Sequence, residues 1–317
     1  MNILVVGSVA YDSVQTPEGS NRHQLGGSAT YFSIAASYFT RVGLVAVVGK
    51  DFARQDFRVL EERGVDTTGL ETNPGETFQW QGQYTEDLNA AITIETRLNV
   101  FEKFKPALPE THRHAPYLFL ANISPDLQHA VLDQMSTRPK LVACDSMNLW
   151  IEIAKPRLLE LIEKVDVLMI NESEARQLTG TRSLVGASAA LLKQGLKALV
   201  VKRGEYGAVV FHKDFTFAAP AYPLARIVDP TGAGDSFAGG FMGYLAAVDD
   251  TGSEAMRRAA VAGSVMASFT VEDFGVGRLK SLKPAEINAR FNAFVELTRF
   301  HPLGGGQGLP LLFAPTA

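Results

Sequence analysis

The stretch of sequence that decides most about this chain reads Asp229-Pro230-Thr231-Gly232-Ala233-Gly234-Asp235-Ser236-Phe237-Ala238-Gly239-Gly240-Phe241. Its small residues Gly232–Gly234 form a turn that leads into an apolar segment with helical character. Backbone N–H groups at the start of a helix, together with the helix dipole, attract anions. Glycine lets a phosphate approach the backbone closely and permits unusual dihedral angles. The turn therefore indicates an anion-binding helix start.

An acidic residue, Asp235, follows this turn directly. A carboxylate repels a neighbouring phosphate, which is costly unless the carboxylate has a chemical task. Accepting the proton of an attacking hydroxyl group would be such a task. The alternative is an acid that only complements the dipole at a helix N-terminus. The Gly-x-Gly-Asp pattern alone leaves these two interpretations balanced.

Composition and charge exclude several classes of protein. The chain has 317 residues, of which 46% are hydrophobic and 20% charged, as in ordinary globular proteins. A net charge of −4 gives no support to a nucleic-acid partner. No apolar segment has the length of a membrane span, and Met1–Gly7 is typical of a first strand rather than a signal peptide. The single cysteine, Cys144, excludes an intrachain disulfide. We expect a cytoplasmic protein that binds neither nucleic acid nor membrane.

Short apolar runs alternate with segments of helical period along most of the chain. Runs that are apolar on both faces suit buried parallel strands, and the alternating order favours a parallel sheet with helices on both faces. The expected strands are Ile3–Val6, Leu44–Val48, Tyr117–Leu120, Leu141–Ala143, Val167–Ile170 and Ala198–Val201. The expected helices are Ser28–Phe39, Ala53–Arg63, Asp126–Met135, Pro156–Lys164, Glu172–Thr179, Leu184–Gln194, Gly234–Ala247, Ser253–Ser268 and Pro284–Thr298. The sequence therefore predicts a three-layer, Rossmann-like α/β domain.

Two segments interrupt this alternation. Residues 11–25 are polar and rich in turn formers, and residues 77–99 alternate like a hairpin with its turn near Glu86–Asn89. We expect them to form a small sheet on the main domain, which covers residues 1–300. This sheet is either a surface hairpin or a lid that excludes water from a substrate cleft. Residues 301–317 contain Gly304–Gly306 and two prolines, so we expect a flexible or loosely docked tail.

The full segment from Asp229 to Phe241 resembles the second signature of the PfkB (ribokinase-like) carbohydrate kinase family. In that family the aspartate at the position of Asp235 is the catalytic base, and the amides of Gly232–Gly234 form the anion hole. The resemblance implies a ribokinase-like fold with a small β-sheet lid, and transfer of the γ-phosphoryl group of ATP to a sugar or nucleoside hydroxyl. It also implies Mg²⁺, and a monovalent cation such as K⁺ near Asp229 and Thr231. Thr231 is counted with the nucleotide-binding residues as well.

Candidate acceptor-binding residues lie earlier in the chain. Asp12 is similar to the sugar-binding acid of the family, because a carboxylate can accept hydrogen bonds from two vicinal hydroxyls, although it could equally cap a turn. Gly26-Gly27-Ser28-Ala29-Thr30-Tyr31 is similar to the first family signature, whose glycine pair contacts the sugar. Tyr31 replaces the usual asparagine, which suggests a different acceptor or a reshaped pocket. The glycine pair also fits a tight loop before a helix capped by Ser28. Asn122 lies where some members bind sugar through an acid.

Two further motifs resemble the nucleotide side of the family site. Asn171-Glu172-Ser173-Glu174 matches an Asn-x-x-Glu motif, which implies that Asn171 contacts phosphate and that Glu174 orders Mg²⁺ through water. A capping box explains the same spacing, and both interpretations can hold together. Lys202-Arg203-Gly204-Glu205-Tyr206-Gly207 resembles the nucleotide-binding loop Thr-x-Gly-x-x-Gly, with Lys202 in place of threonine. A plain hairpin is the alternative there. Asp145 and Asn148 resemble another family segment, with unusual spacing.

Other functions fit parts of the sequence. A catalytically silent sugar- or nucleotide-binding regulator could use the same fold, although the intact Gly232–Asp235 segment argues against it. A dehydrogenase lacks support, because Gly7-Ser8-Val9-Ala10-Tyr11-Asp12 replaces the expected Gly-x-Gly-x-x-Gly. The acceptor stays open between sugars and nucleosides. Aromatic residues that could stack on a base (Phe78, Trp80, Tyr84 and Tyr31) favour a nucleoside slightly. They could equally pack the interior or form a homodimer contact through an exposed lid edge.

Overall fold

The computed structural model describes residues 1–299. Its main sheet has nine strands in the order β13-β12-β11-β10-β9-β8-β1-β4-β5. Neighbours from β11 through β5 in this order pair in parallel, whereas β12 and β13 pair antiparallel. The strands are β1 Ile3–Val6, β4 Val42–Gly49, β5 Asp66–Asn73, β8 Tyr117–Leu120, β9 Leu141–Asp145, β10 Val167–Asn171, β11 Ala198–Lys202, β12 Ala208–His212 and β13 Thr216–Ala219. The tail expected at 301–317 lies outside the described residues.

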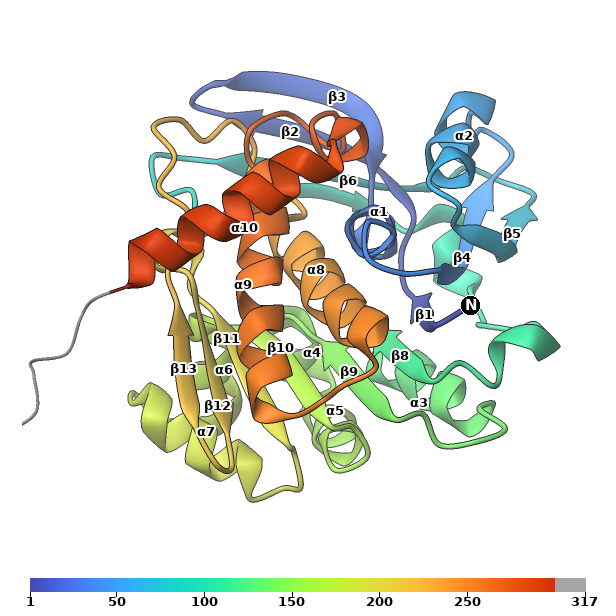
Figure 1. Cartoon of the computed structure of the whole chain (residues 1–317). Coiled ribbons are helices and arrows are strands. Elements are labelled where there is room, and N and C mark those ends of the chain that lie inside the picture. Colours follow the sequence, from blue (N-terminus) through green and yellow to red (C-terminus); the bar gives the residue numbers. More distant parts are fainter. Residues whose placement is uncertain (300–317) are drawn as a thin grey trace, which may run out of the picture.

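Helices cover both faces of this sheet (Figure 1). Alternate residues of each buried strand enter opposite cores: Ile3 and Val5 pack in one, Leu4 and Val6 in the other. The first core is closed by α1 Ser28–Ala36, α2 Arg54–Glu62, α8 Ala233–Val248, α9 Ser253–Thr270 and α10 Pro284–Thr298. The second is closed by α3 Pro125–Asp133, α4 Asn148–Ile153, α5 Lys155–Ile162, α6 Glu172–Thr179 and α7 Leu184–Leu192. This is the three-layer α/β arrangement that the sequence predicts. Short 3₁₀ turns occupy Asn99–Lys103, Glu110–His112, Gly204–Tyr206 and Leu279–Ser281.

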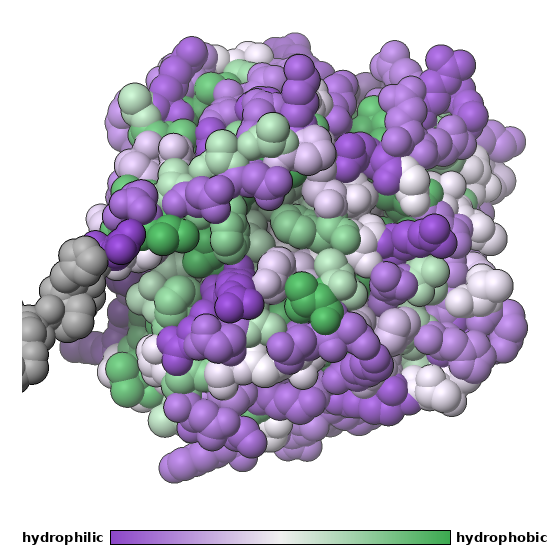
Figure 2. Space-filling model, viewed as in Figure 1, coloured by the Kyte–Doolittle hydropathy of each residue, from purple (hydrophilic) through white to green (hydrophobic). Residues whose placement is uncertain are grey.

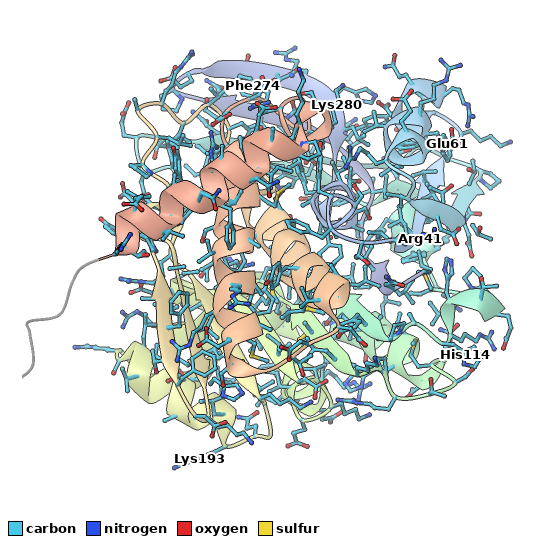
Figure 3. The ribbon with its side chains drawn as sticks, in the orientation of Figure 1. Arg41, Glu61, His114, Lys193, Phe274 and Lys280 are labelled. Carbon is cyan, nitrogen blue, oxygen red and sulfur yellow. The ribbon has the colours of Figure 1, made fainter. Side chains whose placement is uncertain are left out.

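A second sheet of four strands lies along one end of the main sheet (Figure 1). Its order is β3-β2-β6-β7, with bounds β2 Ala10–Thr16, β3 Gly19–Gly26, β6 Phe78–Tyr84 and β7 Ala91–Arg97. The central pair β2–β6 is parallel, and each partner carries an antiparallel outer strand. Segments 11–25 and 77–99 therefore supply the strands of one sheet. The β2–β3 turn lies beside Phe274 (Figure 3), whose ring would be 3.7 Å from a Cβ on Gly19.

β5, β13 and α4 have no counterpart among the expected elements, and β12 corresponds only to the hairpin that was the alternative for residues 202–207. β5 and β13 are the edge strands of the main sheet and are partly exposed, so they lack the continuous apolar run of a buried strand. Helix α4 has only six residues, too few for a helical period to be recognised. The helix that starts at Ser28 also ends earlier than expected, at Ala36.

Most of the apolar residues lie in the interior, and the visible surface is accordingly polar for the most part (Figure 2). The face drawn in Figure 2 is mostly hydrophilic, with hydrophobic residues gathered in the middle of the view next to α10. Cys144 is buried with a free thiol. Within residues 1–299, no helix has both the length and the apolar character that crossing a membrane requires.

Candidate active site

The candidate residues come together at the carboxyl ends of the parallel strands. Asp145 ends β9, Asn171 ends β10 and Lys202 ends β11. The loop before α8 brings the 229–235 segment to this edge, where Gly234 lies beside the Lys202 side chain. Ligands of α/β sheets bind in the crevice outside these strand ends. The arrangement therefore places the predicted nucleotide-side residues at one edge of the sheet, where Lys202, Gly204, Gly207 and Gly234 line the same pocket.

The turn before α8 holds its backbone in a conformation that favours glycine. Gly232 is the N-cap residue, with φ 74° in the left-handed region. A Cβ at this position would lie 2.4 Å from the ring of the buried Tyr31. The Ala233 amide donates to the Pro230 carbonyl at 3.2 Å. Among residues 1–299, the amides of Gly234 and Asp235 have no protein acceptor, so these two N–H groups are available to an anion.

Asp235 lies in the first turn of α8 and is half-buried. Burial raises the pKa of its carboxyl to about 7, and the neighbouring Asp145 adds to the rise while Lys202 opposes it. A carboxyl that titrates near neutral pH is suited to take a proton from a hydroxyl group and release it later. The position and the electrostatics of Asp235 therefore agree with the interpretation as a base.

Lys202 and Asp145 form a buried ion pair next to this turn. Lys202 Nζ lies 2.7 Å from Asp145 Oδ2, and the Asp145 carboxylate also accepts the Ser146 amide at 2.8 Å. Burial raises the pKa of Asp145 and Lys202 lowers it. For Lys202, burial lowers the pKa, but the attraction of Asp145 and Glu174 outweighs burial and the net shift is upward. The sequence left Asp145 without a role, although its place at the end of a parallel strand could have marked it.

Asn171 and Glu174 form the capping box of α6. Asn171 Oδ1 accepts the Glu174 amide at 2.8 Å, and Glu174 Oε2 accepts the Asn171 amide at 2.8 Å. Burial raises the pKa of Glu174 to about 7, against the attraction of Lys202. No group of three or more His, Cys, Asp or Glu residues within 1–299 could hold a metal ion by itself. Mg²⁺ commonly binds through one or two carboxylates, phosphate oxygens and water, so Glu174 and Asp145 fit this ion.

The acceptor side is built around Asp12 on β2. A Cβ on Gly26 would lie 1.9 Å from Asp12 Oδ2, so only a glycine leaves room for this carboxylate. Gly27 has φ 93° and caps α1. Burial raises the pKa of Asp12 to about 7; the Gly27 amide opposes the rise, whereas the charges of Asp229 and Asp235 increase it. Asp12 and Asp235 are therefore close enough for the charge of Asp235 to raise the pKa of Asp12.

Two tyrosines, Tyr31 and Tyr84, lie next to the loop that precedes α8. Tyr31 is fully buried, and its hydroxyl has no hydrogen-bond partner among the described residues. Burial raises its pKa well above the ordinary value, and the charge of Asp12 raises it further. The Tyr84 hydroxyl is 3.4 Å from Thr231 Oγ1, and burial raises the pKa of Tyr84 to about 12. The hydroxyl of Tyr31 is thus a buried polar group without a partner among the described residues, next to the turn at Gly232.

The Asp229 carboxylate ties three segments together. Its oxygens accept the Thr231 amide at 2.9 Å, the Gln24 side-chain amide at 3.2 Å and the Gly275 amide at 3.1 Å. Gln24, on β3, was absent from the residues expected in the site. A carboxylate has about four acceptor sites, so these three donors leave about one free. Asp229 therefore anchors the small sheet to the catalytic loop in this structure.

A pocket of about 810 Å³ opens on the other side of the Gly234 turn. Phe237, Ile227 and Leu224 give it apolar walls, and Lys202 and Gly204 border it at the strand end. Its cover is the β6–β7 turn, where a Cβ on Gly204 would lie 1.7 Å from Asn89 Oδ1. Gly204 and Gly207 have φ 54° and 82°. The small sheet therefore reaches the predicted nucleotide side as well as the acceptor side.

Asn122 follows β8, and its side chain is already engaged. Asn122 Oδ1 accepts the indole N–H of Trp150 at 3.0 Å, which leaves the amide nitrogen Nδ2 for another partner. The structure thus joins this candidate to α4. Nothing in the sequence pattern pointed to that pairing, because the two residues come from separate segments.

The raised pKa values predict how activity depends on pH. Asp235 has to be ionised to accept a proton, so kcat/KM for the acceptor should fall as the pH drops below about 7. If ionised Asp12 is also needed, the fall will exceed tenfold per pH unit. Initial rates at limiting acceptor and saturating ATP measure this profile. A profile that stays flat down to about pH 5 would contradict a base with this pKa.

Comparisons with known proteins identify the family of this chain. The model of the pfkB family carbohydrate kinases matches residues 1–281. The cytidine kinase of Thermococcus kodakarensis is 32% identical over 252 residues, which cover 77% of this chain and 88% of the relative.

Two solved structures share the fold. A nucleoside kinase from Burkholderia thailandensis in complex with inosine has a TM-score of 0.75 at 20% identity, covering 92% of this chain and 97% of its own. A putative ribokinase II from E. coli in complex with ATP and Mg²⁺ has a TM-score of 0.77 at 20% identity, covering 92% of this chain and 99% of its own. With a family match over most of its length and a glycine turn that leads into Asp235, the chain belongs to the pfkB family of carbohydrate kinases.

Proposed function

We propose that this chain is a nucleoside kinase within its family. The family and its relatives make it an enzyme that transfers a phosphoryl group from ATP to a hydroxyl of a sugar or nucleoside. The relative with 32% identity is named a cytidine kinase, which favours a nucleoside. The observation that carries the proposal is the position of Asp235 in the first turn of α8, where its own amide and that of Gly234 have no acceptor among residues 1–299.

In the proposed mechanism, Asp235 accepts the proton of the acceptor hydroxyl. The hydroxyl oxygen forms a bond to the γ-phosphorus, and the bond from that phosphorus to the β–γ bridging oxygen breaks. The free amides of Gly234 and Asp235 would stabilise the negative charge on the transferring group, whereas the Ala233 amide, expected in the anion hole, is bonded to the Pro230 carbonyl. Asn171 and Thr231 border the phosphates, and Glu174 would hold Mg²⁺ through water. When bound, the metal ion neutralises charge on the phosphate oxygens.

The acceptor is proposed to lie between Asp12 and the inner face of the small sheet. Asp12 would accept hydrogen bonds from the sugar hydroxyls, and Gly26 and Gly27 let the backbone approach them. The Tyr31 hydroxyl and the Asn122 amide nitrogen are free donors that could bind the same acceptor. Water is excluded when the small sheet closes over this space.

An ADP-release screen over sugars and nucleosides, with and without K⁺, tests the proposal. We expect turnover with a nucleoside and a lower rate with free pentoses. Binding of nucleoside and ATP without ADP release would instead identify a regulatory binding protein. Turnover with sugars alone would leave the kinase assignment intact and contradict the nucleoside acceptor. K⁺ activation would support a cation near Asp229.

Trp80 is proposed to stack on the nucleobase. The β2–β6 register pairs it with Asp12, and residues paired across neighbouring strands project from the same face of a sheet. Tyr84 projects from this face as well, and Thr231 Oγ1 reaches its hydroxyl. Stacking on an aromatic side chain is worth about 1–3 kcal/mol per base. Trp80→Ala should therefore raise KM for the nucleoside about tenfold and change kcat less.

Fluorescence gives a direct test of this contact, because the chain has two tryptophans, Trp80 and Trp150. In Trp150→Phe, the emission reports on Trp80 alone and should change when the nucleoside binds. Trp80→Phe is the matched control: its remaining Trp150 bonds Asn122, so only the part of the change that this variant lacks reports on Trp80. Equal changes in both variants would contradict stacking on Trp80.

The outer strand β7 is proposed to form a homodimer contact. All its residues are exposed, including Ile92 and Ile94 at 52% and 55%. Exposed edge strands pair readily with a second chain. Sedimentation should show a dimer that Ile94→Lys converts to a monomer. Val185→Lys, at another exposed apolar residue on α7, should leave the dimer intact; a wild-type monomer would contradict the contact.

A further inference from the structure

The buried Lys202 is placed to act on the transferring phosphoryl group itself. Its side chain is 18% exposed and that of its partner Asp145 is 5% exposed. Removing a charged pair from water costs several kcal/mol for each ion, and a single ion pair often fails to recover that cost. A contribution to folding stability is therefore a weak explanation for the buried pair of Lys202 and Asp145.

Lys202 Nζ lies close to the turn that binds the anion. A Cβ on Gly234 would be 3.2 Å from Nζ, so the ammonium faces the Cα of the residue whose amide is free. The Gly234 and Asp235 amides and the Lys202 ammonium thus border the same space. A phosphate group can accept hydrogen bonds from backbone amides at a helix start and from a lysine ammonium on a neighbouring strand.

The Lys202 ammonium also has N–H donors that are not used within residues 1–299. It carries three N–H donors, and Asp145 is its one hydrogen-bond acceptor among residues 1–299. Three nearby carboxyl groups, those of Asp145, Glu174 and Asp235, raise the pKa of Lys202. These carboxylates repel the negative charge of a triphosphate, so a positive charge is needed where the phosphoryl group is transferred. Lys202 can provide this charge while it stays paired with Asp145.

We propose that Lys202 is a catalytic residue whose ammonium contacts an oxygen of the transferring phosphoryl group, and that Asp145 is a positioning residue that holds the ammonium there. The inference rests on the proposed kinase function. During transfer the bond between the acceptor oxygen and phosphorus forms, the bond from phosphorus to the bridging oxygen breaks, and the proton goes to Asp235. Lys202 keeps its protons and stabilises the charge that spreads over the phosphoryl oxygens.

The charge-removing variant Lys202→Met tests the catalytic part. Loss of one preorganised donor typically lowers kcat about 10²–10³-fold, and we expect a loss of this size with a small change in the Kd of ATP. Lys202→Arg keeps the charge and should recover part of the lost kcat. If Lys202→Met raises KM for ATP and leaves kcat unchanged, Lys202 only binds the nucleotide and the proposal is wrong.

A binding measurement separates this inference from the proposed function. ADP with aluminium fluoride and a nucleoside imitates the group in transfer, and Lys202→Met should weaken this complex far more than it weakens ADP alone. Asp133→Asn, at an exposed residue of α3, retains Lys202 and should bind the complex as wild type does. Tight wild-type binding without product formation would contradict the kinase function and leave Lys202 supported. Equal binding by wild type and Lys202→Met would overturn the role of Lys202.

A double-mutant cycle tests the positioning part. If Asp145 acts through Lys202, Asp145→Asn lowers kcat in the wild type but adds little in the Lys202→Met background. Losses that multiply would show that Asp145 acts independently, and the positioning role would be wrong. A single replacement leaves one buried charge unpaired and can unfold the chain, whereas the double variant leaves none. Thermal unfolding of all variants identifies those that fold, and the double variant keeps the comparison with Lys202→Met available.

Discussion

Asp235→Asn is expected to lower kcat by about 10²–10⁴-fold while leaving the Kd of ATP nearly unchanged, because a positioned base contributes a factor of this size. Asparagine has almost the same shape as aspartate, so the α8 helix start and the Gly234 amide stay in place. It cannot take the proton of the acceptor hydroxyl. Steady-state rates and calorimetric ATP binding measure the two quantities. Wild-type turnover by the variant would contradict the assignment of Asp235 as base.

The same variant should be more stable than wild type at alkaline pH. The folded state raises the pKa of Asp235 to about 7 from an ordinary value of 3.8, so the folded protein holds this proton more tightly than the unfolded chain. The stabilisation from that proton is complete below the unfolded pKa and is lost as the pH rises through about 7. Asparagine carries no such charge. The melting temperature of Asp235→Asn should therefore exceed that of wild type at about pH 8 and approach it at about pH 4.

Exposed Asp133 on α3 offers the matched control. Asp133→Asn makes the same chemical change far from the crevice, so kcat and melting temperature should stay at wild-type values. A melting temperature of Asp235→Asn that is lower than wild type at every pH would contradict the raised pKa. If Asp235→Asn changes kcat but not the melting temperature, Asp235 is supported as the base, but an electrostatic cost of burying its carboxylate is not.

Gly232→Ala is expected to damage both stability and turnover. Alanine at φ 74° costs about 1–2 kcal/mol, and a methyl group pushed into a packed ring costs about 1–3 kcal/mol more. The added Cβ would lie 2.4 Å from the Tyr31 ring, so the turn must shift. A misplacement of about 1 Å can reduce turnover about 10²-fold. Urea unfolding and steady-state rates measure the two effects.

Gly180→Ala separates backbone strain from steric clash. Gly180 ends α6 with φ 70°, and a Cβ there meets no atom within 4 Å. This control should therefore show a conformational cost of about 1–2 kcal/mol and wild-type kcat. If Gly232→Ala loses no more stability than Gly180→Ala and keeps its turnover, close packing of the turn on Tyr31 has no functional importance.

The sequence alone was sufficient for features that depend on neighbouring residues. The buried strands at Ile3–Val6 and Tyr117–Leu120, the helix at Glu172–Thr179 and the helix start before Asp235 all follow from local patterns. Both interpretations of Asn171 and Glu174 could be stated in advance, because a capping box involves residues only three positions apart. Hydrophobic period and turn chemistry act over these short distances, so they are visible without a structure.

Tertiary structure decided the contacts between distant segments. Lys202 meets Asp145 across 57 positions, and Gln24 meets Asp229 across 205. Asn89 reaches Gly204 because the small sheet folds back over the nucleotide side. The chain order contains both members of each pair, but only the order of strands in the sheet brings them together. Local patterns therefore determined most of the elements and pointed to Asp235 as the candidate base, whereas packing of the sheets determined which charges surround it.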